Sequence, residues 1–222
     1  MIKGVIFDMD GLMIDSETVT YQMFVKKLHK LGYDDFDEEN YKAVLGKNKK
    51  GICQVFIDKY GDKFPIDDFW DESHIWIDES LRHHVPLKTG LVELLEYLKA
   101  HHYKTVVATS SERARVQEIL SHGHILHYFD DMVCGDEVSK GKPDPETFLT
   151  ACQKINVQPQ EALVLEDSEP GILAAHQGHI DVICIPDKKY PEDFFANRTV
   201  AILESLHDVI HYLDKEKKVC AI

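Results

Sequence analysis

The fold of this 222-residue chain is decided by the stretch Val5-Ile6-Phe7-Asp8-Met9-Asp10-Gly11. Its apolar run breaks off at an Asp-x-Asp-Gly sequence, which predicts a buried strand that ends in a turn. Two carboxylates, Asp8 and Asp10, therefore stand at the exit of a strand. Like charges beside an apolar strand need a cation or a proton to offset their repulsion, and oxygen ligands in this pattern suit magnesium. A solvated Asp-Gly turn is the alternative for this stretch alone.

A second apolar run, residues 162–165, also ends in paired carboxylates, Glu166 and Asp167. Four acids at two strand ends indicate one site. Between the two pairs, hydroxyl groups follow the strand-like segment 103–108 in Thr109-Ser110-Ser111, and Lys142 precedes a proline. Hydroxyls and one ammonium group would complete a site for a phosphate. Taken singly, Thr109 could instead be a helix cap and Lys142 an exposed loop lysine.

These motifs carry a family resemblance. In order and spacing, Asp8-Met9-Asp10-Gly11, Thr109, Lys142-Pro143 and Glu166-Asp167-Ser168 are similar to the four motifs of the haloacid dehalogenase superfamily. The match runs essentially from end to end, and the chain most resembles the phosphatases and β-phosphoglucomutase-like enzymes that carry a helical cap after the first motif. The resemblance implies an α/β fold, with a parallel-sheet, Rossmann-like core and an inserted α-helical cap domain.

The spacing of hydrophobic residues favours the same two domains, a core and an inserted helical cap. Residues 16–86 show helical periodicity and no convincing strand, so we expect the cap at 16–86 and the core domain at 1–15 and 87–222. From Leu91 onward predicted helices alternate with predicted strands, which indicates a parallel sheet covered on both faces. The strands are expected at 103–108, 131–134, 162–165, 181–185 and 199–203, and the helices at 91–101, 112–121, 145–155, 171–177 and 206–213. Ligands of such sheets bind at the carboxyl ends of the strands, where every motif lies.

The resemblance also implies roles. Asp8 would be the nucleophile that forms an aspartyl-phosphate, and Asp10 the general acid and base, with a pKa raised by burial and by neighbouring charge. Thr109 and Lys142 would donate to the phosphoryl oxygens. Magnesium would be held by Asp8, the backbone carbonyl of Asp10, Asp167 and, in support, Glu166.

The leading function is a magnesium-dependent phosphatase that acts on a small phosphorylated metabolite, a sugar phosphate or a nucleotide monophosphate. An acid at Asp10 disfavours dehalogenation. A β-phosphoglucomutase-like phosphosugar mutase is the alternative, although Thr20 stands where the resemblance to the mutases expects histidine. Gly46, Lys47 and Lys49 occupy the cap loop where those mutases carry an arginine, and with Ser110 they are the predicted substrate-binding residues. A non-catalytic module that keeps the fold is the third possibility.

Composition narrows the class of partner. A formal charge of −14 disfavours nucleic acid and anionic membranes. No segment approaches the roughly 20 apolar residues of a membrane span, and the amino terminus lacks a signal-peptide pattern, so we expect a cytoplasmic protein. The five cysteines are scattered without metal-type spacing, which predicts reduced and mostly buried thiols. We expect a monomer or a weak homo-oligomer.

Overall fold

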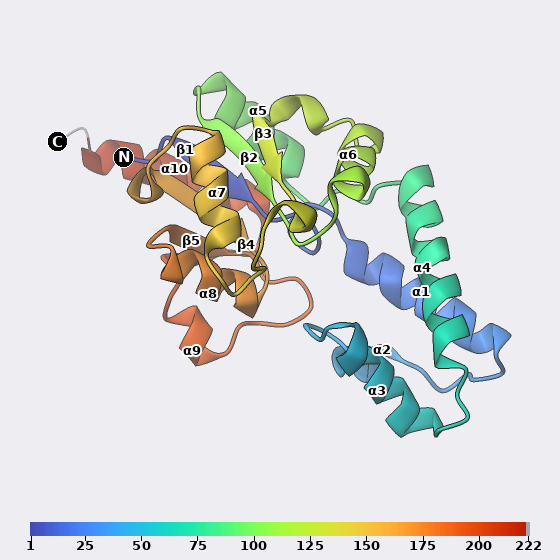
Figure 1. Cartoon of the computed structure of the whole chain (residues 1–222). Helices are drawn as coiled ribbons and strands as arrows, with labels where there is room; N and C mark the ends of the chain where they lie inside the picture. Colours follow the sequence, from blue (N-terminus) through green and yellow to red (C-terminus); the bar gives the residue numbers. More distant parts are fainter. Residues whose placement is uncertain (221–222) are drawn as a thin grey trace. The chain divides into compact units, whose positions relative to one another are not determined.

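The structure is a computed structural model that describes residues 1–220, with side chains described to Glu216 (Figure 1). The chain forms two compact units. One unit combines Met1–Asp15 with the chain from Pro86 onward, and the other is Ser16–Val85. The second unit is thus inserted after the first strand, between Asp15 and Pro86.

The first unit is built on a six-stranded sheet whose paired strands are all parallel, in the order β3-β2-β1-β4-β5-β6. The prediction of an α/β fold with a parallel sheet is confirmed. The strands are β1 (Gly4–Phe7), β2 (Lys104–Ala108), β3 (Asp131–Val133), β4 (Ala162–Glu166), β5 (Asp181–Cys184) and β6 (Ala201–Ile202). β1 lies between β2 and β4, so the segments that follow these three strands are neighbours at the carboxyl edge.

The register explains how distant carboxylates meet. Phe7 pairs with Leu165 of β4 on one side and with Val107 of β2 on the other. The Asp8 N–H continues the ladder by donating to the Leu165 carbonyl over 3.1 Å. All four residues of β1 and all five of β4 are buried, as expected for strands covered on both faces. Asp8 and Glu166 therefore end adjacent buried strands.

Helices cover this sheet. Apolar residues of α7 (Glu146–Lys154) and α8 (Glu169–Gln177) form one buried cluster with strand residues such as Ile6 and Val164, and α7 lies in front of the strands in Figure 1. Because side chains alternate along a strand, Val5 and Phe7 face the opposite side from Ile6. The other helices of this unit are α5 (Leu91–Ala100), α6 (Arg113–His122), α9 (Asp193–Ala196) and α10 (Leu206–Cys220), with 3₁₀ turns at Leu126–Tyr128, Gly135–Glu137 and Pro159–Glu161.

Most element boundaries agree with those predicted, and the differences matter at β4. Glu166 is the last residue of that strand and does not follow it. The next helix begins at Glu169, two residues before the predicted Gly171, because Ser168 caps it and Pro170 is accommodated in its first turn. At the other end of the chain, α10 extends past the predicted Leu213 to Cys220.

The second unit is helical: α1 (Ser16–Lys30), α2 (Glu38–Lys42), α3 (Lys49–Tyr60) and α4 (Ile66–His83). An aromatic core holds it together. Phe56 is fully buried, and the centre of its ring lies 4.4 Å from the ring centre of Phe69 and 5.6 Å from that of Phe24. Beside this core, the buried Lys27 ammonium group donates to Asp68 and Glu72 of α4, so α1 and α4 are joined by charge as well as by packing.

The thiols of Cys134, Cys152 and Cys184 are free and buried, and Cys53 is free and half-buried, which confirms the prediction for these four residues. The side chain of Cys220 lies outside those described. Across the helices described, none combines the length and the apolar character needed to cross a membrane.

Candidate active site

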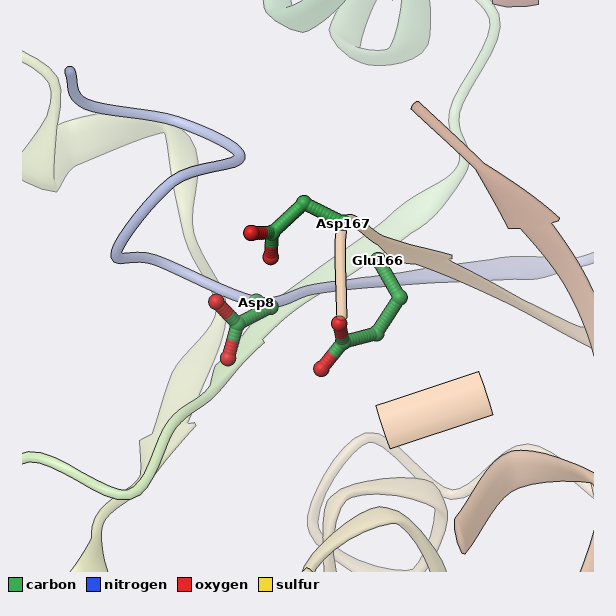
Figure 2. A group of neighbouring side chains, drawn as sticks. All are labelled: Asp8, Glu166 and Asp167. Atoms are coloured by element: carbon green, nitrogen blue, oxygen red, sulfur yellow. The ribbon is translucent and has the colours of Figure 1, made fainter. Parts of the chain in front are cut away.

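Three carboxylates meet where β1 and β4 end. Asp8, Glu166 and Asp167 each offer one oxygen, and these oxygens lie within 4.8 Å of one another (Figure 2). Asp8 is 7% exposed and Glu166 is fully buried. Acids separated by more than 150 positions in the sequence are thereby brought into one cluster of a size suited to a single cation.

The ammonium group of Lys142 lies among these carboxylates. Its Nζ lies 2.5 Å from Asp8 Oδ1 and 2.6 Å from Glu166 Oε1, and only 6% of its side chain is exposed. Lys142 is therefore not an exposed loop lysine. The predicted grouping of Asp8, Lys142, Glu166 and Asp167 is what the structure shows, although their chemical roles stay a prediction.

Two hydrogen bonds also hold Glu166 through its second carboxylate oxygen. Its Oε2 accepts from the Ser168 N–H over 2.7 Å and from the Ser168 hydroxyl over 2.8 Å. The same hydroxyl oxygen caps α8 by accepting from the Gly171 N–H over 3.3 Å. Ser168 therefore combines the two roles that the sequence could not separate, a helix cap and a partner of a site carboxylate.

Asp167 lies against the turn that follows Asp10. Gly11 has φ +87°, a conformation that residues with a side chain rarely adopt, and a Cβ on it would lie 2.3 Å from Asp167 Oδ2. The Asp-x-Asp-Gly turn thus needs glycine for two reasons. One is its backbone angle, and the other is the close approach of the Asp167 carboxylate, which directly follows β4.

Burial and mutual repulsion raise the pKa values of two of these acids. Burial, together with the charges of Glu166 and Asp10, raises the pKa of Asp8 to about 7 even though Lys142 opposes the shift. The pKa of Asp167 is raised well above its ordinary value by burial and by the charges of Glu166 and Asp8. For Lys142, burial lowers the pKa, but Asp8 and Glu166 outweigh it and the net shift is upward.

The donor set fits a divalent cation. All three acids offer carboxylate oxygens, the ligands that magnesium prefers, and one ammonium group cannot balance their charge. Burial first, and then the repulsion among these acids, raises the pKa values of Asp8 and Asp167. A bound divalent ion would offset this repulsion.

Thr109 and Ser110 follow β2, the strand next to β1. Thr109 is 2% exposed, and its N–H donates to the Val133 carbonyl over 3.0 Å. Its hydroxyl accepts from the Ser111 N–H over 3.2 Å, while α6 begins only at Arg113, so Thr109 is not the helix cap considered as an alternative. Ser110 is exposed in the same loop.

Asp10 has a partner that sequence reasoning missed. Arg115 Nη1 lies 2.9 Å from Asp10 Oδ2 and Arg115 Nη2 lies 3.0 Å from Oδ1, while the Ser111 hydroxyl donates to Oδ2 over 2.9 Å. The expectation of a buried Asp10 is wrong, because 33% of its side chain is exposed in the turn beyond β1. No local pattern signals this contact, since Ser111 precedes α6 and Arg115 lies within it.

The remaining predicted residues, Gly46, Lys47 and Lys49, lie in the helical unit. All three are exposed. Gly46 has φ +70°, and Lys49 opens α3 with its Nζ 5.1 Å from the centre of the Trp70 ring. Their role in substrate binding stays a prediction.

Comparison with known proteins agrees with this geometry. The family model described as haloacid dehalogenase-like hydrolase matches residues 5–185, which include every carboxylate of the cluster. The chain belongs to the haloacid dehalogenase-like hydrolases. The resemblance noted in the sequence is confirmed, and so is the prediction of a hydrolytic enzyme of this family.

Among relatives of this hydrolase, a phosphorylated carbohydrates phosphatase from Thermotoga maritima is 29% identical over 82% of this chain and 84% of its own length. A fructose-1-phosphate phosphatase from Escherichia coli is 31% identical over 81% of this chain and 94% of its own. The solved structure of CbbY from Rhodobacter sphaeroides in complex with phosphate is 26% identical, covers 94% of this chain and 96% of its own, and superimposes with a TM-score of 0.75.

Proposed function

We propose that this protein is a magnesium-dependent phosphatase that hydrolyses a small phosphorylated carbohydrate through an aspartyl-phosphate on Asp8. The observation that carries the proposal is the contact of one buried ammonium group, Lys142, with both Asp8 and Glu166, next to Asp167. This contact supports the proposal because it brings two carboxylates and a cation together at the carboxyl ends of β1 and β4, where parallel sheets bind ligands.

The reaction has two displacements at phosphorus. In the first, an oxygen of Asp8 bonds to phosphorus, the bond to the leaving oxygen breaks, and Asp10 gives that oxygen a proton. In the second, Asp10 takes a proton from water, whose oxygen bonds to phosphorus and displaces Asp8 as inorganic phosphate forms. Lys142 and Thr109 donate to the phosphoryl oxygens, which carry the developing charge.

Asp8, Asp167, the backbone carbonyl of Asp10 and, in support, Glu166 would hold magnesium. When bound, the ion supplies positive charge that screens the anionic nucleophile from the anionic phosphate. Two features of this chain maintain the donor set: Ser168 holds Glu166, and Gly11 leaves space for Asp167.

For the substrate class, the support comes from relatives that are named for phosphorylated carbohydrates and for fructose 1-phosphate. A nucleotide monophosphate is the second class to be compared. We assign the helical unit the role of a cap, in which the exposed residues Gly46, Lys47 and Lys49 would meet the substrate's distal groups, with Ser110 on the core side.

A phosphosugar mutase is the alternative. One observation weighs against it: Thr20, where the resemblance to the mutases expects a histidine, directs its hydroxyl back to the Ser16 carbonyl of its own helix at 2.9 Å. A mutase would need a doubly phosphorylated sugar for priming and would release little inorganic phosphate.

Phosphate release across a panel of phosphomonoesters, with and without magnesium, tests the proposal. The wild-type protein should release phosphate only with the metal, and Asp8→Asn should be inactive. Asp58→Asn, a change of an exposed aspartate in α3, should have wild-type activity. Equal rates for the wild-type protein and Asp8→Asn would overturn the proposal, and turnover that needs a bisphosphate primer would favour the mutase.

A further inference from the structure

The most specific polar contact outside the metal-type cluster is the one between Arg115 and Asp10. Two nitrogens of the guanidinium group face two oxygens of the carboxylate, at 2.9 and 3.0 Å. Ser111 closes the arrangement, since its hydroxyl oxygen lies 2.7 Å from Arg115 Nη1 and 2.9 Å from Asp10 Oδ2. A planar fork that engages both oxygens fixes the plane of a carboxyl group, which a single hydrogen bond does not.

Local helix energetics do not explain why Arg115 stands where it does. It lies in the first turn of α6, which contains no acidic residue. A cation at a helix amino terminus opposes the helix dipole and is unfavourable there. Arg113 lies in the same first turn of α6, and its charge is offset by Glu137, whose carboxylate is 2.7 Å away. For Arg115 the compensating acid is Asp10, which belongs to the turn after β1.

The pair lies at the surface, partly open to solvent, and is not part of the buried core. The side chains of Arg115 and Asp10 are 29% and 33% exposed. Single ion pairs that are open to solvent typically contribute little to stability, and a bidentate arginine–carboxylate pair contributes more than one contact does. An Arg115 variant should therefore fold, which leaves its effect on the reaction measurable.

We propose that Arg115 is a positioning residue for proton transfer: it acts through Asp10, whose carboxyl plane it fixes with the help of Ser111. The inference rests on the proposed function, in which Asp10 gives a proton to the leaving oxygen and later takes one from water. Positioning matters there because a misplacement of about 1 Å can cost about 10²-fold in rate. Arg115 itself needs no contact with the substrate.

Substrates with different leaving groups distinguish a positioning role of Arg115 from other effects of its replacement. An alkyl phosphate needs a proton on its leaving oxygen, whereas 4-nitrophenyl phosphate has a leaving group that departs without one. The ratio kcat/KM reports the first displacement. Arg115→Ala should lower kcat/KM about 10²-fold for the alkyl phosphate that the wild-type protein hydrolyses fastest, through kcat with KM nearly unchanged. For 4-nitrophenyl phosphate, kcat/KM should change less than about threefold, since general acid catalysis contributes nothing there.

Arg113→Ala is the matched control. It removes the other first-turn arginine of α6 and that arginine's ion pair with Glu137, but it leaves Asp10 untouched. Both esters should be hydrolysed by this control at nearly the wild-type rate. Arg115→Lys should restore little, because an ammonium group cannot form the fork, whereas guanidinium ion added to Arg115→Ala should restore part of the alkyl phosphate activity.

The outcomes distinguish a failure of the proposed function from a failure of the positioning role of Arg115. If the wild-type protein hydrolyses no phosphomonoester, the proposed function is wrong and the inference falls with it. If the wild-type protein is active but Arg115→Ala slows both esters equally, slows neither, or behaves like Arg113→Ala, the proposed function stands and the positioning role is overturned.

Discussion

The Lys142 ammonium group lies 2.5 Å from Asp8 Oδ1, although 134 residues separate the two in the chain. The parallel register makes this contact possible, because Asp8 directly follows β1 and Glu166, the second partner of Lys142, ends the adjacent strand β4. The fold thus places one buried cation between Asp8, the proposed nucleophile, and Glu166, where our proposal also has it bind the phosphoryl group.

Replacing that cation should damage stability and activity together. Lys142→Met leaves Asp8 and Glu166 buried without their shared partner, and such a loss typically costs about 3–5 kcal/mol. Phosphate release should fall about 10²-fold or more, since a donor to the transition state is lost. Denaturant unfolding and phosphate-release assays measure the two effects.

Lys104→Met is the control for that change. Lys104 pairs with Asp130 at the surface, and both side chains are more than one-third exposed. Its loss should cost about 1 kcal/mol or less. A Lys142→Met protein as stable and active as Lys104→Met would contradict the role given to the buried ammonium group.

A methyl group at Gly171 should displace Glu166. An added Cβ would lie 1.8 Å from Glu166 Oε1, which is fully buried and has little room to move. Gly171→Ala should therefore destabilise the protein by about 1–3 kcal/mol, as overpacking does, and lower activity. This cost competes with a gain of about 1 kcal/mol in helix propensity from alanine. Gly141→Ala, with nothing within 4 Å of its added Cβ, should be close to neutral in the same assays.

Magnesium should stabilise the protein more at pH 8 than at pH 5.5. The folded pKa of Asp8, about 7, is above its ordinary 3.8, so the metal-free fold loses stability as the pH rises from 3.8 through 7 and Asp8 ionises. Below pH 7 a proton competes with the ion for this carboxylate. Melting temperatures with and without magnesium at the two pH values test this. A shift that is equal at both, or larger at pH 5.5, would speak against Asp8 as a ligand.

Glu137 should stabilise the fold at neutral pH and lose this contribution in acid, which is the opposite of the pH dependence given by Asp8. Burial alone would raise its pKa, but hydrogen bonds from Arg113, Lys154 and the Cys134 N–H lower it from 4.5 to about 2. The contribution is complete above pH 4.5 and is lost as the pH falls toward 2. Glu137→Gln should cost about 1–3 kcal/mol at pH 7. The difference from wild type, measured by urea unfolding, should shrink by pH 3; a constant difference would mean that ionisation of Glu137 contributes nothing.

Sequence alone indicated the sheet and the acidic cluster because both arise from local patterns. Apolar runs that end in Asp8 and Glu166 mark strands whose ends must meet in a parallel sheet. Arg115 was missed because its contact with Asp10 depends on the rotation of α6 about its axis, which periodicity does not fix to one residue. Ser168 stayed ambiguous because the two hydrogen bonds of its hydroxyl group, to Glu166 and from Gly171, follow from loop geometry alone.

The central claim is that Asp8 accepts the phosphoryl group. Its most direct test is to quench the protein with acid during turnover of its best phosphomonoester and to locate the added phosphoryl mass among its peptides. We predict that the phosphoryl group is found on Asp8, in magnesium-dependent amount, and that Asp8→Asn carries none. Steady turnover with no phosphorylated peptide in either protein, or with the phosphoryl group on another residue, would contradict the account.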